Sequence, residues 1–468
     1  MVAARTGIKT TITQTRALIA ESLKAIEDVV VSMAPQVVAL ITGLITAVLV
    51  ARGLGPNSLG QYALILSVST FAAILSDLGV GQTAIRYASR AASHGDEKNQ
   101  FAVLRWAFRV RMLQSLLISA VAFVLAPIVA GALWHENSLS SLIQLSLLVG
   151  IFGALAHVPI IYFQSIRRFR MNSIILVAQA VLSFIGIFAI ALLHAWRLDL
   201  IILVNIFTTA LGAVAFLTIT PKAAFVESDR LRVPTRSTLR SAFRPPKPVS
   251  YETGALESRS ISSFAVFMIL SSIIVTITLQ ADVWLMGVFL DTSQIGVYSV
   301  ATKVTLPLVT LLGAINIALW PRVSSVTSRN AVTTLLRKTF QLTFVAAAGA
   351  LFYAVTAPLF VPFVFGSQYA AGIFLAQLLC FRYSVAMLVN PIGLIGYNFG
   401  FVKAYWKINL LQLVVVVLIL VRLLPTLGPV AAALALIVND VIGATAIGLL
   451  VWTKMGRLKK LDTQELRV

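Results

Sequence analysis

Four ionisable residues interrupt long apolar segments in the second half of the chain: Asp282, Lys303, Arg382 and Asp440. Counted from the ends of their segments at the rise of an α-helix, Asp282 and Lys303 share a depth of about 10 to 12 Å, and Arg382 and Asp440 one of about 15 to 17 Å. Buried acids neutralise neighbouring bases or take up protons, whereas exposed bases bind anions. Two interpretations therefore stay open. Each acid holds helices together by pairing with a base, or the bases face a cavity as ligands while the acids serve as counter-ions or coupling groups.

The first half carries fewer such residues. Asp77 precedes a glycine-rich helix end, which favours a local hydrogen-bonding role over ion coupling, and His157 stands two residues before Pro159, where a satisfied buried histidine is the commoner case. Arg86 and Arg322 lie 236 residues apart at corresponding inner ends of predicted helices. They form a pseudo-symmetric basic pair that either anchors helices at the inner surface or captures an anionic group.

Motifs for other chemistry are missing from the sequence. It has no G-x-x-x-x-G-K-[ST] phosphate loop, no H-E-x-x-H and no G-x-S-x-G. Cys380 is the single cysteine, which excludes an intramolecular disulfide or a cysteine metal cluster. We therefore expect neither an enzyme nor a metal or cofactor, and transport would be driven by an ion gradient or by consumption of the product.

The composition places these residues in a membrane. Hydrophobic residues make up 59% of the 468 residues, charged residues 12%, and the mean hydropathy is +0.92. Apolar runs of about 20 residues span a bilayer. About twelve such runs predict an all-α polytopic membrane protein, at 29–51, 61–80, 112–133, 139–163, 171–193, 198–220, 262–289, 296–320, 340–365, 371–397, 405–424 and 430–452.

The chain is an internal duplication. The segment from Leu54 to Ala63 is echoed by the segment from Leu290 to Ser299, and the same offset of 236 residues relates most of the predicted spans. Because six spans is an even number, both copies enter the membrane from the same side as parallel repeats. We expect two six-helix lobes around a central cavity.

The repeated segment predicts a tight turn between helices. Gly55 and Pro56 supply the reversal, while Gly60 and Gly296 permit unusual backbone angles or close helix contact.

The repeat also pairs two tyrosines, and a proline marks a bend. Tyr62 and Tyr298 are expected to anchor as amphipathic rings at the outer interface. Pro307, four residues after Lys303, predicts a helix bend, which either serves as a pivot or reflects irregular helix packing.

Basic residues set the orientation and the domain boundaries. Most of the 37 Lys and Arg residues fall in segments that are cytoplasmic if the N-terminus is inside. The predicted parts are an N-terminal cytoplasmic segment (1–28), an N-lobe (29–220), a basic cytoplasmic linker (221–260), a C-lobe (261–453) and a cytoplasmic tail (454–468). The net charge of +20 is dispersed over short loops, which fits anionic lipid and disfavours nucleic acid.

Ordered sequence pieces carry a resemblance to a known family. The pieces are Val50-Ala51-Arg52-Gly53-Leu54-Gly55-Pro56, Gly60-Gln61-Tyr62-Ala63, Ser76-Asp77-Leu78-Gly79-Val80-Gly81 with Arg86, Ala281-Asp282-Val283-Trp284-Leu285-Met286-Gly287, Ile295-Gly296-Val297-Tyr298 and Pro321-Arg322. In this order they resemble bacterial polysaccharide export proteins and O-antigen flippases. That family belongs to the exporter superfamily that also holds multidrug and toxin extrusion proteins and the lipid II flippase.

The resemblance implies a flippase of the inner (plasma) membrane that moves a polyprenyl-diphosphate-linked oligosaccharide outward by alternating access. It makes Lys303, Arg382, Arg86 and Arg322 candidate diphosphate ligands. Membrane lipids and other polysaccharide assembly proteins are the further partners, and one duplicated chain suffices as a monomer. Two alternatives stay open: a cation-coupled multidrug exporter of the same superfamily, and a membrane glycan polymerase or ligase.

Overall fold

The computed structural model describes residues 2–226, 258–324, 329–398 and 402–465, and throughout these ranges the regular structure is helical. The expected all-α fold class is therefore confirmed for the described chain. In the first half the helices are α1 (Val2–Leu75), α2 (Val80–Ser93), α3 (Glu97–Ile128), the π-helical turn η1 (Val129–Leu133), α4 (Leu139–Ser165), α5 (Phe169–Leu192), α6 (Leu198–Ile219) and the short η2 (Lys222–Ala224). In the second half they are α8 (Ser258–Phe289), α9 (Thr292–Val304), α10 (Leu306–Ser324), α11 (Arg329–Phe365), η3 (Ser367–Gly372), α12 (Ile373–Asn398), α13 (Val402–Leu427) and α14 (Val430–Glu465).

The helix lengths match a multi-span membrane protein. Within the described residues, ten helices are long and apolar enough to cross a bilayer, or eleven if α9 and α10, bent by 42° at Thr305, make one broken span. Counting α1 as two spans brings the total to the expected twelve. That division of α1 depends on the geometry at Gly55.

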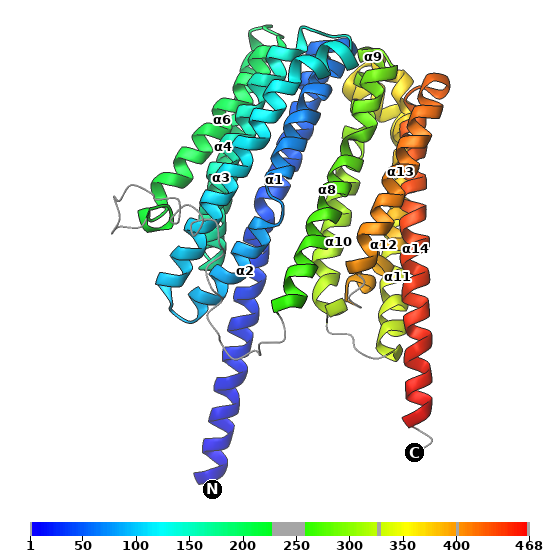
Figure 1. The fold of residues 1–468 in the computed structure, drawn as a ribbon. Coiled ribbons are helices and arrows are strands. Elements are labelled where there is room, and N and C mark those ends of the chain that lie inside the picture. Colours follow the sequence, from blue (N-terminus) through cyan, green and yellow to red (C-terminus); the bar gives the residue numbers. More distant parts are fainter. Residues whose placement is uncertain (1, 227–257, 325–328, 399–401, 466–468) are drawn as a thin grey trace.

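Gly55 reverses the chain within α1. Its φ of 71° and ψ of 173° are far from helical values, and a positive φ is readily adopted by glycine. The N-terminus and α2 both lie toward the end of the molecule opposite α9, whereas Gly60 lies against α9 (Figure 1). The chain must therefore run toward α9 before Gly55 and away from it afterwards. This reversal confirms the turn that the sequence predicted at Gly55 and Pro56.

The described helices form two bundles. In the first bundle α1 packs against α4 and α5, and α4 against α3 and α6; in the second, α8 packs against α13, and α12 against α11 and α14. Contact between the bundles is concentrated on α1, which packs against α9 and α8. The bundles meet near α9 and lie farther apart toward the ends marked N and C (Figure 1).

Large apolar side chains cover the outside of the bundles. On α11, Phe363 is 82% exposed and Leu359 79% exposed. In water these surfaces would be strongly unfavourable, but a bilayer removes them from water without further burial in protein. The exposed apolar belt therefore supports insertion in lipid.

Several helix bounds differ from the predicted spans. The helix α3 begins at Glu97 rather than at 112, so it carries polar turns before the apolar run. Most of the segment 1–28 lies in α1, and α14 continues through the predicted tail to Glu465. Most of the basic linker, residues 227–257, lies outside the described residues. Hydropathy locates the part of a helix in lipid, whereas the helix itself continues wherever its backbone bonds persist.

Candidate functional site

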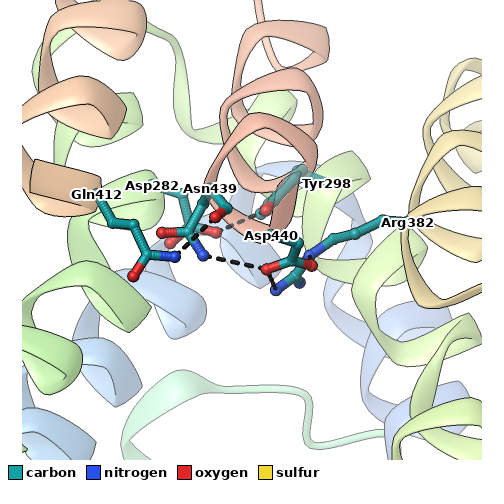
Figure 2. A network of polar contacts seen from close by, with 6 residues as sticks. All are labelled: Asp282, Tyr298, Arg382, Gln412, Asn439 and Asp440. Carbon is teal, nitrogen blue, oxygen red and sulfur yellow. Dashed lines mark hydrogen bonds and ion pairs between the residues drawn. The ribbon is translucent and has the colours of Figure 1, made fainter. Parts of the chain in front are cut away.

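A set of six polar side chains lies inside the second bundle (Figure 2). It consists of two hydrogen-bonded groups, one of Arg382, Asp440, Asn439 and Gln412 and the other of Asp282 and Tyr298. Its centre is an ion pair between α12 and α14, in which Arg382 Nε donates to Asp440 Oδ2 at 2.8 Å and Nη2 to Oδ1 at 3.4 Å. Both side chains are 16% exposed. The two N–H groups address the two carboxylate oxygens in the fork arrangement that favours guanidinium–carboxylate pairing.

Neighbouring amides complete this pair. Asn439 Nδ2 donates to Asp440 Oδ1 at 3.0 Å, and Gln412 Nε2 on α13 donates to the main-chain carbonyl oxygen of Asn439 at 2.7 Å. Gly443, one turn along α14, leaves the room for Gln412, since a Cβ there would lie 2.7 Å from Nε2. The α14 side of the pair is thereby held by two further side chains.

Asp282 forms the second acidic part of the set (Figure 2). This residue of α8 is 7% exposed, and its Oδ2 accepts a 2.6 Å hydrogen bond from the hydroxyl of Tyr298 on α9. Its other oxygen accepts from the Val283 amide at 2.8 Å. Tyr298 is 1% exposed, so the expected position of its ring at the outer interface is wrong: the buried carboxylate gives the hydroxyl a partner inside the bundle.

Tyr62 also differs from its expected interfacial role. It is half-buried in the first bundle, where its hydroxyl accepts a 3.0 Å hydrogen bond from Asn205 Nδ2 on α6. The two tyrosines of the duplication therefore have unlike partners. Tyr62 meets a neutral amide, and Tyr298 meets a carboxylate.

The two predicted acid–base pairs have different outcomes. Arg382 and Asp440, placed at one depth from the sequence, are joined as an ion pair. Asp282 and Lys303 are not, because the hydroxyl of Tyr298 occupies the carboxylate and Lys303 is exposed on α9. Among the described residues Lys303 has no hydrogen-bonding or ion-pair partner, so it is a free cation on the helix where the bundles meet.

When Asp282, Asp440 and Arg382 are all ionised, the set in the second bundle carries a net charge of one negative unit. Arg382 Nη1 makes no hydrogen bond to a described residue, so the guanidinium keeps donors beyond those used by Asp440. Groups of three or more metal-ligating side chains do not occur in the described part of the chain. The chemistry available here is ion pairing, proton uptake and anion binding.

A second ionisable cluster lies in the first bundle. Arg111 on α3, with a side chain only 10% exposed, forms an ion pair of 2.5 Å between its Nη1 and Asp77 Oδ1. This contact lacks hydrogen-bond alignment, and Arg111 Nε has no partner among the described residues. Asp77 also accepts from the Gly81 amide at 3.1 Å, and His157 borders the same glycine, 2.6 Å from the position that a Cβ on Gly81 would take.

Asp77 thus caps the start of α2 and also balances a buried arginine. The chain enters α2 through Leu78 and Gly79, with φ of 28° and 79°. This bend brings the carboxylate to the N–H group of Gly81 in the first turn, which has no partner within the helix. The capping role expected from the sequence is present, together with a counter-ion role toward Arg111.

The remaining predicted residues lie apart from both clusters. Arg86 is exposed on α2. Arg322 lies in α10, but its side chain is outside the described part of the structure. Pro307 occupies the first turn of α10, where its missing N–H interrupts no helical bond, and the bend itself is at Thr305.

Sequence reasoning missed Arg111, Gln412 and Asn439. Arg111 stands one residue before an apolar run, at Met112, and was therefore assigned to a cytoplasmic segment. The polar start of α3 at Glu97 was the available signal that a helix carries it into the bundle. Neutral amides carry no comparable signal, because their role depends on which helices become neighbours.

Comparison with known proteins gives one family match. The family model described as "Polysaccharide biosynthesis protein" matches residues 25–327. No curated protein matches the chain.

Solved structures with the same fold are transporters of low sequence identity. The lipid II flippase MurJ in an inward closed conformation has a TM-score of 0.64 and 13% identity, covering 90% of this chain and 87% of that one. A multidrug resistance MATE family transporter of the MOP superfamily, inward-facing, has a TM-score of 0.60 and 13% identity, with coverage of 92% and 99%. An outward-facing MATE structure has a TM-score of 0.56 and 14% identity, covering 92% of this chain and 95% of that one. The expected helical membrane fold, shared with these transporters, is thus confirmed.

Proposed function

Because the chain belongs to the family of polysaccharide biosynthesis proteins, we propose that it is a flippase of the inner membrane for a polyprenyl-diphosphate-linked oligosaccharide. The glycan would be carried from the cytoplasmic to the outer face during the synthesis of a surface polysaccharide such as an O-antigen. Both termini would be cytoplasmic, and one duplicated chain would supply both bundles.

The observation that carries this proposal is the free cation on α9. Lys303 is exposed and unpartnered although it belongs to a helix that packs between the bundles. An unpaired charge within membrane depth is unfavourable unless water or a ligand reaches it. A diphosphate would supply the opposite charge, and the spare donors of Arg382 would add directional hydrogen bonds.

The two parts of the proposed substrate, an apolar tail and a charged head group, match an apolar outer surface and a polar path between the bundles. A prenyl chain is compatible with lipid and with the exposed apolar belt of helices such as α11. The charged, sugar-bearing head group needs a polar path, which the space between two rocking bundles would supply. Head and tail would cross together while the tail stays in lipid.

Coupling remains part of the proposal. Asp282 and Asp440 are the acids whose protonation would change the charge of the set in the second bundle, and Asp77 with His157 is the corresponding group in the first. A proton or cation gradient would act by favouring one arrangement of these partners. No resident cofactor is proposed.

The test is deletion of the gene, followed by extraction of polyprenyl-linked oligosaccharides from spheroplasts treated with an impermeant sugar-labelling reagent. We expect the oligosaccharide to accumulate unlabelled on the inner face and complementation to restore labelling. Unchanged labelling and unchanged surface glycan, in a strain shown to lack a second flippase, would refute the proposal.

One alternative has a specific basis, namely the buried acid Asp282 in a fold shared with multidrug transporters. A cation exporter would show drug accumulation in the deletion strain with normal glycan exposure. A glycan polymerase or ligase would instead form a new glycosidic bond as purified protein, and the fold similarity to transporters gives that activity no support.

A further inference from the structure

The two copies of the repeated turn pack against each other at the end of the molecule near α9. A Cβ on Gly60 would collide with the Thr292 carbonyl, and a Cβ on Gly296 would collide with the Pro56 carbonyl. These contacts are the same contact made twice, because the offset of 236 relates Gly60 to Gly296 and Pro56 to Thr292. The helices therefore cross about a local two-fold axis at backbone contact distance.

Each bundle also binds a helix end of the other near this crossing. From the first bundle, Arg52 donates through Nε to the Val364 carbonyl at 2.8 Å and through Nη2 to the Phe363 carbonyl at 2.5 Å, in the last turn of α11. From the second, the Tyr369 hydroxyl donates to the Ala51 carbonyl at 2.7 Å, in the last turn before Gly55. Carbonyls in a last helical turn have no partner within the helix.

A side-chain hydrogen bond borders the crossing. The hydroxyl of Thr292 donates to Asn57 Oδ1 between the two copies. Deeper along the same contact, Trp284 Nε1 on α8 donates to Ser67 Oγ on α1 at 3.0 Å, and Ser67 is only 4% exposed. Ser67 thus lies behind the crossing as seen from the outside.

The residues at this junction are of the kinds that allow the two bundles to separate. Arg52 and Asn57 are exposed, so water can replace the partners that their side chains lose on separation. Glycines at the crossing remove side chains that would interlock there. Meanwhile a bulky glycan can leave at this end only if the bundles part.

We infer that Arg52, Tyr369, Asn57 and Thr292, arranged around the Gly60–Gly296 crossing, form a latch between the bundles that opens once in every transport cycle. The inference rests on the proposed flippase function for its place in a cycle. The contacts themselves are independent of any substrate. A permanent pivot at the same place would stay closed throughout.

Cross-linking separates a latch from a pivot. The double variant Asn57→Cys/Thr292→Cys is treated with a short bis-methanethiosulfonate reagent, and dithiothreitol releases the link; the native Cys380 is buried and gives little background. We expect outward exposure of the lipid-linked glycan to fall at least tenfold on cross-linking and to recover on reduction. Each single variant, treated in the same way, serves as a control.

Labelling tests the latch without substrate. In an otherwise unchanged chain, Ser67→Cys is exposed to an impermeant maleimide from outside. Adding Arg52→Ala and Tyr369→Phe removes three hydrogen bonds of the latch, and the labelling rate should rise about tenfold or more. The matched control is Arg197→Ala, because this 70% exposed arginine pairs with Asp199 inside its own bundle.

The outcomes distinguish the two ideas. Full glycan transport by a fully cross-linked protein would overturn the latch and leave the flippase function intact. A labelling rate that Arg52→Ala and Tyr369→Phe leave unchanged would also overturn it. Increased labelling in a protein that moves no lipid-linked glycan would instead keep the latch and reject the proposed substrate.

Discussion

Replacing Asp440 by asparagine should destabilise the protein by leaving Arg382 buried without its counter-charge. The side chain keeps its shape, and one oxygen still accepts from the guanidinium. The other carboxylate oxygen is replaced by an NH2 group, whose N–H donors then face an N–H donor of Arg382. Because both partners are only 16% exposed, little water is available to replace the lost charge.

The magnitude follows from that burial. Removing one partner of a buried ion pair costs about 3 to 5 kcal/mol, and the retained acceptor of asparagine places Asp440→Asn near about 3 kcal/mol. This corresponds to roughly a hundredfold change in the equilibrium between folded and unfolded protein. The double variant Arg382→Met/Asp440→Leu, which removes both charges with similar volume, should recover most of the loss.

Denaturant unfolding of the purified protein in detergent micelles measures these differences as a double-mutant cycle. The control pair is Arg197 and Asp199, which are 70% and 35% exposed. Exposed pairs contribute about 0 to 1 kcal/mol, so Asp199→Asn should change the free energy of unfolding by less than that.

Transport by the same variants tests the second role of Arg382. If its spare donors bind diphosphate, Arg382→Met/Asp440→Leu should be stable yet transport poorly, and Arg382→Ala should lose transport while membrane insertion stays normal. A stability unaffected by Asp440→Asn would refute the reasoning about the ion pair. Full transport by the double variant would refute the ligand role.

Three further perturbations have direct readouts. Lys303→Ala should lower outward glycan exposure at equal protein level, and Lys303→Arg should retain most of it; equal transport by all three forms would remove Lys303 from the site. Tyr298→Phe leaves a buried carboxylate oxygen without its donor and should lower the free energy of unfolding by about 1 to 3 kcal/mol, more than Tyr62→Phe, whose partner is a neutral amide. Gly296→Ala should loosen the contact between the bundles, measured as faster outside labelling, whereas Gly313→Ala, which meets open space, should leave it unchanged.

Much of the fold was predictable because lipid imposes a strong constraint on sequence. Every crossing needs a long apolar helix, so hydropathy located the spans and the offset of 236 paired them. The glycine-proline turn was also readable, since a positive φ at Gly55 is what a reversal needs. The depth of Arg382 and Asp440 followed from helical rise alone, and they do form a pair.

Predictions failed where the outcome depended on helix rotation and on neighbours. Asp282 and Lys303 were predicted to share a depth, yet depth says nothing about the direction in which a side chain points from its helix. The hydroxyl of Tyr298 lies within reach of Asp282, and Lys303 points elsewhere. Arg111 was missed for a related reason, because hydropathy does not record the buried face of a helix before it enters lipid.

The duplication itself separates what the fold needs from what one bundle adds. Gly60 and Gly296 make one contact twice, so the crossing of the bundles needs a residue without a side chain at both positions. The bundles differ at the paired tyrosines. The Tyr62 hydroxyl accepts a hydrogen bond from the neutral amide of Asn205, whereas the Tyr298 hydroxyl donates to the carboxylate of Asp282. A purely structural tyrosine needs only some buried polar partner, and an amide is the less costly one in lipid. The presence of a carboxylate in the second bundle, near an arginine that keeps free donors, is therefore better explained by interaction with a charged ligand than by packing. We therefore expect Asp282→Asn to preserve or raise stability while it lowers transport, and normal transport by this variant would assign the carboxylate to packing.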